Sequence, residues 1–151
     1  MELVFREVVF ADKDEIISLF IDTYKREPWN ENWESEIAHE RIKGFMENNL
    51  SGNYCVTNKD NKIIGVLLGH TNFFVDKKEF FIEEFFIDHD HQGKGIAKKF
   101  MEYVENEIKQ KGHASMVLLT KKSFPSEKFY TNIDFKTSQS VVLMFKEMGE
   151  S

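Results

Sequence analysis

Gln92-Gly93-Lys94-Gly95-Ile96-Ala97 joins an apolar, strand-like run to a stretch with helical periodicity. Two glycines in such a turn let the backbone approach a ligand closely, and the first amides of the following helix have no partner within that helix. Amides at the positive end of a helix dipole bind anions, phosphates above all. Lys94, Lys98 and Lys99 add positive charge beside the turn. The turn therefore predicts a phosphate-binding site.

Two common phosphate-binding motifs do not fit this turn. A dinucleotide-binding fold needs G-x-G-x-x-G early in its first βαβ unit, and a P-loop needs G-x-x-x-x-G-K-[ST]. The residues from 92 to 97 supply neither spacing. A ligand other than a dinucleotide or a P-loop nucleotide is expected.

The segments on both sides of the turn predict a mixed α/β fold. Residues 80–87 are apolar on both faces, as in a central strand, and residues 95–111 have helical periodicity. With a strand at 116–120, this strand–helix–strand unit implies a parallel pair joined by a right-handed crossover. The remaining pattern predicts strands at 3–10, 54–57, 63–70 and 140–146 and helices at 12–27, 34–48 and 125–132. These elements form one domain from residue 1 to about 148.

Length, charge and cysteine content restrict the function. The 151 residues include 20 Lys and Arg against 26 Asp and Glu, a net charge of −6, which disfavours nucleic acid as a partner. Polar residues interrupt every apolar stretch before the ~20 residues of a membrane span, and the N-terminus lacks a signal-peptide layout. The single Cys55 excludes an internal disulfide framework and favours a cytoplasmic location.

Two motifs resemble those of the GNAT superfamily of N-acetyltransferases. The family's coenzyme A loop is written Q/R-x-x-G-x-G/A, and Gln92, Gly95 and Ala97 occupy its fixed positions. Downstream, Lys128–Phe135 resembles the family's F-Y-x-x-x-G-F segment, with Asp134 in place of the glycine. Aspartate tolerates a left-handed turn better than most residues. The resemblance covers nearly the whole chain and implies a mostly antiparallel sheet with a splayed parallel central pair, flanked by helices.

The resemblance implies acetyl-CoA as co-substrate and a site for each part of it. The pantetheine arm would pair with backbone groups of Phe85, Phe86 and Ile87. The pyrophosphate would lie on amides of the turn, that is, of Gln92, Gly93, Lys94, Gly95, Ile96 and Ala97. Tyr130, in the F-Y segment, would protonate the departing thiolate, or else it is an amphipathic helix residue with a wet hydroxyl.

Glu83 and Glu84 interrupt an otherwise apolar strand. A buried carboxylate is costly unless it is paired or has a raised pKa, and a pKa raised toward neutrality suits a general base. Neighbouring strand residues face opposite sides, so at most one of the two should face the substrate. The resemblance places the base on the parity of Phe81 and Glu83, which ranks Glu83 first and Glu84 second. A bulge could reverse this order, and a structural ion pair is the alternative.

The segment from Pro28 to Glu34 is expected to contribute to the acceptor site. Trp29 and Trp33 flank the acidic Glu31, and ring faces and carboxylates both attract cations. A hydrophobic clasp on the core is the alternative, favoured for Trp29. A P-W-x-x-x-W stretch followed by a helix resembles the subset that includes aminoglycoside 6'-N-acetyltransferase-like proteins.

Two other signals are given structural interpretations. Asp88-His89-Asp90-His91 contains metal-ligand types, but four consecutive residues rarely converge on one ion. We expect a solvated turn there and no metal. Cys55 lies in a predicted strand, where a small buried hydrophobe is expected rather than a nucleophile.

The sequence thus predicts an acetyl-CoA-dependent N-acetyltransferase acting by direct attack on a primary amine of a small cationic molecule, with aminoglycoside- and polyamine-like molecules as the candidates. The alternatives are a protein or peptide N-acetyltransferase and a non-catalytic module that senses coenzyme A. The resemblance also allows a homodimer, while the acceptor's identity and the acyl length stay open.

Overall fold

The computed structural model describes residues 2–149, and the described chain forms two compact units. The first unit ends at Leu119 and the second begins at Thr120. That both make one domain, as the sequence predicts for residues 1–148, stays a prediction. The elements are β1 (Val4–Glu7), the 3-10 turn η1 (Phe10–Asp12), α1 (Lys13–Lys25), α2 (Ser35–Glu47), β2 (Ser51–Thr57), β3 (Ile63–Phe74), β4 (Lys77–Ile87), the 3-10 turn η2 (His89–His91), α3 (Ile96–Gln110), β5 (His113–Leu118) and α4 (Pro125–Asn132).

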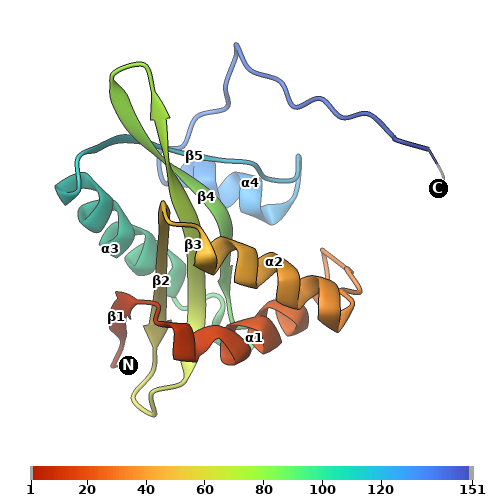
Figure 1. Cartoon of the computed structure of the whole chain (residues 1–151). Helices are drawn as coiled ribbons and strands as arrows, with labels where there is room; N and C mark the ends of the chain where they lie inside the picture. Colours follow the sequence, from red (N-terminus) through yellow and green to blue (C-terminus); the bar gives the residue numbers. More distant parts are fainter. Residues whose placement is uncertain (1, 150–151) are drawn as a thin grey trace. The chain divides into compact units, whose positions relative to one another are not determined.

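A five-stranded sheet forms the centre of the first unit, with its strands in the order β1-β2-β3-β4-β5 (Figure 1). Neighbours from β1 to β4 pair antiparallel. β5 pairs with β4 in parallel, after the chain has crossed over through α3. The predicted mixed α/β fold with one parallel pair is confirmed.

The side chain of one turn residue explains the β2–β3 hairpin, whereas the β3–β4 hairpin is longer than predicted. The side-chain oxygen of Asn58 accepts hydrogen bonds from the amides of Asp60 and Lys62, both at 3.0 Å, which closes the β2–β3 turn. β3 and β4 are longer than the sequence indicates. The turn between them lies at Val75, which has φ 57°, and Lys77 and Lys78 already pair with β3.

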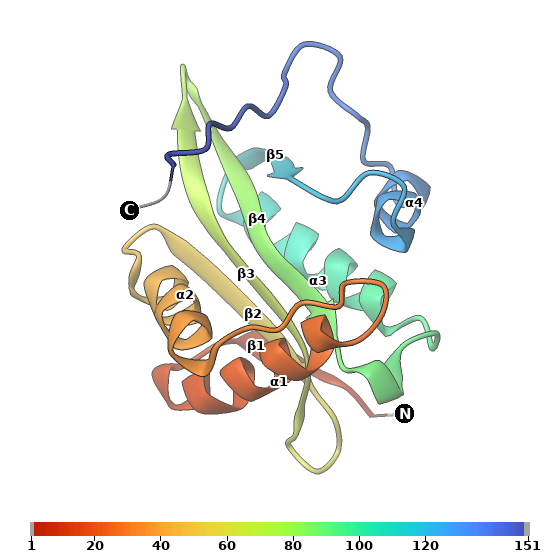
Figure 2. The same cartoon turned by 90° about the vertical axis from the view of Figure 1, so that its right-hand side faces the viewer.

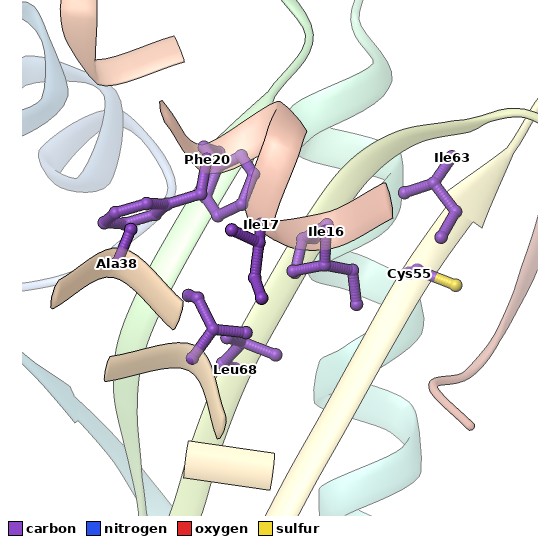
Figure 3. Packing of buried hydrophobic residues seen from close by; sticks show 10 residues of the cluster. Ile16, Ile17, Phe20, Ala38, Cys55, Ile63 and Leu68 are labelled. Carbon is purple, nitrogen blue, oxygen red and sulfur yellow. The ribbon is translucent and has the colours of Figure 1, made fainter. Parts of the chain in front are cut away.

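Helices cover both faces of this sheet, with α1 and α2 on one face and α3 on the other (Figure 2). Between the sheet and α1 and α2 lies a cluster of buried apolar side chains, part of which is shown in Figure 3. On the other face, Phe100 of α3 packs against Phe85 of β4 with ring centroids 5.7 Å apart. This arrangement follows from the amphipathic sequence of α3, in which the buried residues recur at helical spacing.

In the second unit, α4 has the predicted bounds, but the predicted strand at 140–146 is absent. Residues 135–149 form neither helix nor strand, and Val141 to Phe145 are 66–86 % exposed. The prediction rested on β propensity, which describes how side chains fit a half-buried sheet and supplies no backbone partner. Asp134 has φ 75°, which confirms that it takes the left-handed conformation expected at this position.

Candidate active site

β4 and β5 separate part-way along their length. Their parallel pairing runs from Lys78 and His113 to Ile82 and Leu118 and ends there. β4 continues for five further residues, 83–87, of which 84–87 stay paired with β3 on the other side. Over this stretch, the edge of β4 that faces β5 is therefore not paired with β5. Backbone groups on such an edge can bind an extended ligand by main-chain hydrogen bonds.

The glycine turn follows directly at the end of this stretch. Gly93 has φ 76° and Gly95 has φ 77°, and an added Cβ at either would meet nothing within 4 Å. The side-chain amide of Gln92 donates a 3.0 Å hydrogen bond to the carbonyl oxygen of Ile87, which ties the turn to the end of β4. Gln92 thereby holds the turn in place through its side chain.

The start of α3 is favourable for an anion. Gly95 is the N-cap residue, and no side chain caps the helix. The first turn holds no acidic residue, while Lys94, Lys98 and Lys99 are exposed beside it. Free amides, the helix dipole and these lysines thus all favour the binding of an anion. The residues fit a phosphate-bearing ligand.

A β-bulge in β4 changes which way the two carboxylates face. In the pairing with β3, Leu68 stands opposite Glu84 and the next residue, Gly69, stands opposite Ile82. Glu83 is therefore the extra residue of the bulge, and the alternation of side chains is interrupted there. Oε1 of Glu83 lies 3.3 Å from Nδ1 of His70. His70 shares the β3 face of Leu68, which packs in the α1 and α2 cluster.

Glu84 faces the same side of the sheet. Its Oε2 lies 3.5 Å from Nε of Arg41 on α2. The expectation that at most one carboxylate faces the substrate side depended on strict alternation, and the bulge removes that premise. Both carboxylates lie on the face covered by α1 and α2.

Glu84 is buried without full compensation. Its residue is 8 % exposed, and Oε2 has no hydrogen-bond partner among the described residues. Burial raises the pKa of Glu84 to about 7, against the opposing effect of the Arg41 charge. A carboxylate of this kind can accept or release a proton near neutral pH.

Arg41 connects Glu84 to the segment between α1 and α2. Its guanidinium lies over the rings of Trp33, at 5.2 Å, and Phe45, at 5.1 Å. The indole Nε1 of Trp33 donates a 2.8 Å hydrogen bond to Glu31. The structure thus brings together Glu31, Trp33 and Glu84, three residues singled out in the sequence, with Arg41 among them.

Trp29 and Trp33 differ in their surroundings. Trp33 packs edge-on against Phe20 at 4.9 Å and belongs to the rim of the apolar cluster. Trp29 contacts Tyr24 at 5.3 Å and is half-buried. The hydrophobic clasp, favoured for Trp29 from the sequence, therefore also describes Trp33, whose ring holds Arg41 as well.

The comparison with protein families decides the family. Residues 14–135 match the family model described as the acetyltransferase (GNAT) family, which is more than half of the chain. The chain belongs to the GNAT acetyltransferase family. This confirms the resemblance found in its two motifs and the prediction that the protein is an acetyltransferase.

Solved structures share the fold of this acetyltransferase at low sequence identity. A possible acetyltransferase from Clostridium difficile 630 has a TM-score of 0.83 at 13 % identity, covering 99 % of this chain and 100 % of that one. AAC(6')-Iy, in complex with the bisubstrate analogue CoA-S-monomethyl-acetylneamine, has a TM-score of 0.75 at 15 % identity, covering 97 % and 99 %. The ribosomal-protein-alanine N-acetyltransferase from Brucella melitensis biovar Abortus 2308 has a TM-score of 0.74 at 15 % identity, covering 96 % and 100 %. A search of curated proteins finds no significant match.

Other predicted features of this GNAT protein have local explanations. Asp88 is buried and its carboxylate lies 2.7 Å from Nδ1 of His91, so the turn expected to be solvated is partly closed by this contact. Within residues 2–149, no group of three or more His, Cys, Asp or Glu side chains is placed to hold a metal ion.

Cys55 is fully buried, as expected for a core residue, and burial raises its pKa to about 11. No helix among the described residues is long and apolar enough to cross a membrane.

Tyr130 lies on α4 in the second unit. Its ring packs against Phe129 and Phe135 of the same unit, at 5.4 Å from each. The amphipathic-helix interpretation of Tyr130 is thus supported within its own unit, and its catalytic role stays a prediction.

Sequence reasoning missed Arg41 and His70. Arg41 occupies the face of α2 that otherwise carries Ala38 and Ile42, and a charge on an apolar helix face needs a partner. The matching signal was Glu84 in an apolar strand, so the pair was open to prediction. His70 gave no such signal, because its neighbour depends on the β3–β4 register.

Proposed function

We propose that this acetyltransferase transfers the acetyl group of acetyl-CoA to a primary amine of a small cationic molecule, by direct attack within a ternary complex. The observation that carries the proposal is the arrangement along β4 beyond its pairing with β5. Two carboxylates stand where the pairing ends, and the anion-binding turn stands where the strand ends. One continuous edge thus joins a place for amine chemistry to a place for phosphates.

The donor would lie along this edge. Acetyl-CoA supplies the activated thioester. Backbone groups of Phe85, Phe86 and Ile87 would pair with the pantetheine arm and polarise the thioester carbonyl, and the amides of residues 92–97 would hold the pyrophosphate. The positive φ angles of Gly93 and Gly95 and the absence of acidic residues in the first turn of α3 support this placement. AAC(6')-Iy, which shares the fold, was solved with a bisubstrate analogue that contains CoA.

The acceptor would approach from the face that holds the carboxylates. An ammonium ion must lose one proton before its nitrogen can attack and a second proton as the amide forms. Glu84 is the better-supported base because burial raises its pKa to about 7, and Glu83, from the same bulge, is the alternative. Glu31, with Trp33 and Trp29 beside it, would attract the positive charge of the acceptor. Tyr130 would return a proton to the departing thiolate.

Direct transfer also agrees with the state of the single thiol. The thiolate is the nucleophilic form of cysteine, and Cys55 is fully buried with a raised pKa. Transfer through a cysteine-bound acetyl group is therefore disfavoured in this chain.

An acceptor panel tests the proposal. The purified protein is incubated with acetyl-CoA and kanamycin, spermidine, lysine ethyl ester or a peptide with an N-terminal alanine, and thiol release is measured. We expect release with a polycationic small amine. Release only with the peptide would overturn the small-molecule acceptor in favour of a peptide. No release with any acceptor, together with a melting temperature raised by coenzyme A, would identify a coenzyme A-binding module instead.

A further inference from the structure

A histidine and a carboxylate form a pair at the bulge of β4. Nδ1 of His70 lies 3.3 Å from Oε1 of Glu83, and the imidazole stacks on the ring of Phe81 at 5.5 Å with an angle of 25° between the planes. These contacts hold the ring from one edge and one face. The side chains of His70 and Glu83 are 28 % and 27 % exposed, so both can reach solvent.

The position of Glu83 selects which ring nitrogen is available. A carboxylate beside Nδ1 favours a proton on that nitrogen, which leaves the lone pair of neutral histidine on Nε2. Phe81 fixes the plane of the ring. This is the arrangement of a general base with an orienting acid.

Proton balance in amine acetylation leaves a task for a second base. The acceptor enters as an ammonium ion with three protons on nitrogen and leaves as an amide with one. Of the two protons lost, one is matched by the proton that coenzyme A gains on sulfur, and the other goes to water. Oε2 of Glu84 is buried and therefore has no direct contact with solvent, and it has no hydrogen-bond partner among the described residues. His70 is on the same face, and its half-buried side chain is 28 % exposed.

We propose that His70 is a catalytic residue that takes the first proton of the acceptor ammonium at Nε2 and delivers it to solvent, with Glu83 as its positioning residue. The N–H bond of the ammonium breaks, its electron pair stays on the nitrogen, and an Nε2–H bond forms. The imidazolium then gives the proton to water. Glu84 takes the second proton, which is lost during attack, and this proton replaces the one that the departing thiolate gains on sulfur. This inference rests on the proposed function.

Other charges on this face act on the same step. Glu83, on β4, faces the imidazole, while Glu84 lies next to it in the bulge and pairs with Arg41 of α2. Glu31, from the segment between α1 and α2, is close enough to affect Glu84. The neighbour of His70 in β2 is Ser51, which carries no charge. Thus three carboxylates and one guanidinium surround the site of deprotonation.

The test compares His70→Gln and Glu83→Gln with a matched histidine variant, His39→Gln. His39 is half-buried on α2 and contacts Lys13 at 3.3 Å, outside this cluster. The kcat/KM for the acceptor that releases thiol in the panel above is measured from pH 5.5 to 9.5. Acetyl-CoA affinity and melting temperature are measured alongside. ¹⁵N NMR of the imidazole in the coenzyme A complex at pH 8 identifies the tautomer.

We expect His70→Gln to lower kcat/KM at pH 7 by about 10² or more and to make the acidic limb of the profile less steep, because only Glu84 must then be deprotonated, with acetyl-CoA affinity unchanged. Glu83→Gln should lower kcat/KM less than His70→Gln does, because the imidazole remains but loses its positioning partner, and His39→Gln should leave the profile unchanged. An unaltered profile in His70→Gln, or a change in acceptor KM alone, would overturn the role of His70. A neutral ring protonated on Nε2 would overturn it as well. Absence of turnover in the unmodified protein with every acceptor would refute the proposed function itself.

Discussion

Glu84→Gln should change how the stability of the protein depends on pH. Burial raises the pKa of Glu84 from 4.5 to about 7, so the folded protein binds this proton more tightly than the unfolded chain does. The contribution of Glu84 to stability is therefore complete below pH 4.5 and is lost as the pH rises through 7. At about 1.4 kcal/mol per pKa unit, the loss amounts to about 3 kcal/mol. Glutamine does not titrate, so the free energy of unfolding of the variant lacks this decrease with rising pH.

Urea unfolding followed by tryptophan fluorescence at pH values from 4.5 to 8.5 measures the effect. The variant also leaves Arg41 without its partner, but that cost is the same at every pH because arginine stays charged. The free energy of unfolding of the unmodified protein, minus that of the variant, should therefore fall by about 3 kcal/mol across the range. Glu40→Gln, at an exposed position on α2, is the matched control and should give a flat difference. A flat difference for Glu84→Gln too would refute the uncompensated burial of this carboxylate.

Three further experiments test the proposed donor site, the proposed proton donor and the core. Gly95→Asp should weaken coenzyme A binding by tenfold or more in calorimetry, whereas Gly95→Asn, which tolerates φ 77° equally well, should weaken it less; equal affinities would place the pyrophosphate elsewhere. Tyr130→Phe should lower turnover without changing acetyl-CoA affinity, and unaltered turnover would remove Tyr130 from catalysis. Gly69→Ala should destabilise the fold by about 1–3 kcal/mol, since its Cβ would lie 2.6 Å from the carbonyl oxygen of Phe81. Gly44→Ala should stabilise the fold by about 1 kcal/mol, because Gly44 lies on the exposed side of α2 and an added Cβ would meet nothing within 4 Å. Urea unfolding measures both variants, and a Gly69→Ala protein more stable than the Gly44→Ala protein would contradict both expectations.

The conformation of the glycine turn, where the donor is proposed to bind, was predictable from the sequence because its determinants are local. Two glycines, a strand before them and a helix after them fix a turn with outward amides over a few residues. The positive φ angles of Gly93 and Gly95 and the start of α3 at Ile96 agree with that expectation. The same holds for Asp134, where the left-handed conformation followed from one side chain.

The cluster where the acceptor is proposed to bind depends on pairing between distant segments and was less predictable. The contact between His70 and Glu83 requires the β3–β4 register, and that register contains a shift between Leu68 and Gly69. A period of two gives no sign of an inserted residue, so counting along the strand misplaces every side chain on one side of the bulge. The absent strand at 140–146 has a related cause, because propensity alone does not provide a pairing partner.

The bulge explains why the strand sequence Phe80-Phe81-Ile82-Glu83-Glu84-Phe85-Phe86-Ile87 is compatible with a core on both faces. Strict alternation would place one carboxylate on each face, and the one facing α3 would lie among Phe100 and other buried apolar side chains. An unpaired carboxylate there would cost several kcal/mol. With one residue inserted at Glu83, the α3 face receives only Phe and Ile, and both carboxylates lie on the face that supplies Arg41 and His70. The irregularity that sequence periodicity cannot reveal thus keeps one face apolar and concentrates the titratable groups where the acceptor is proposed to bind.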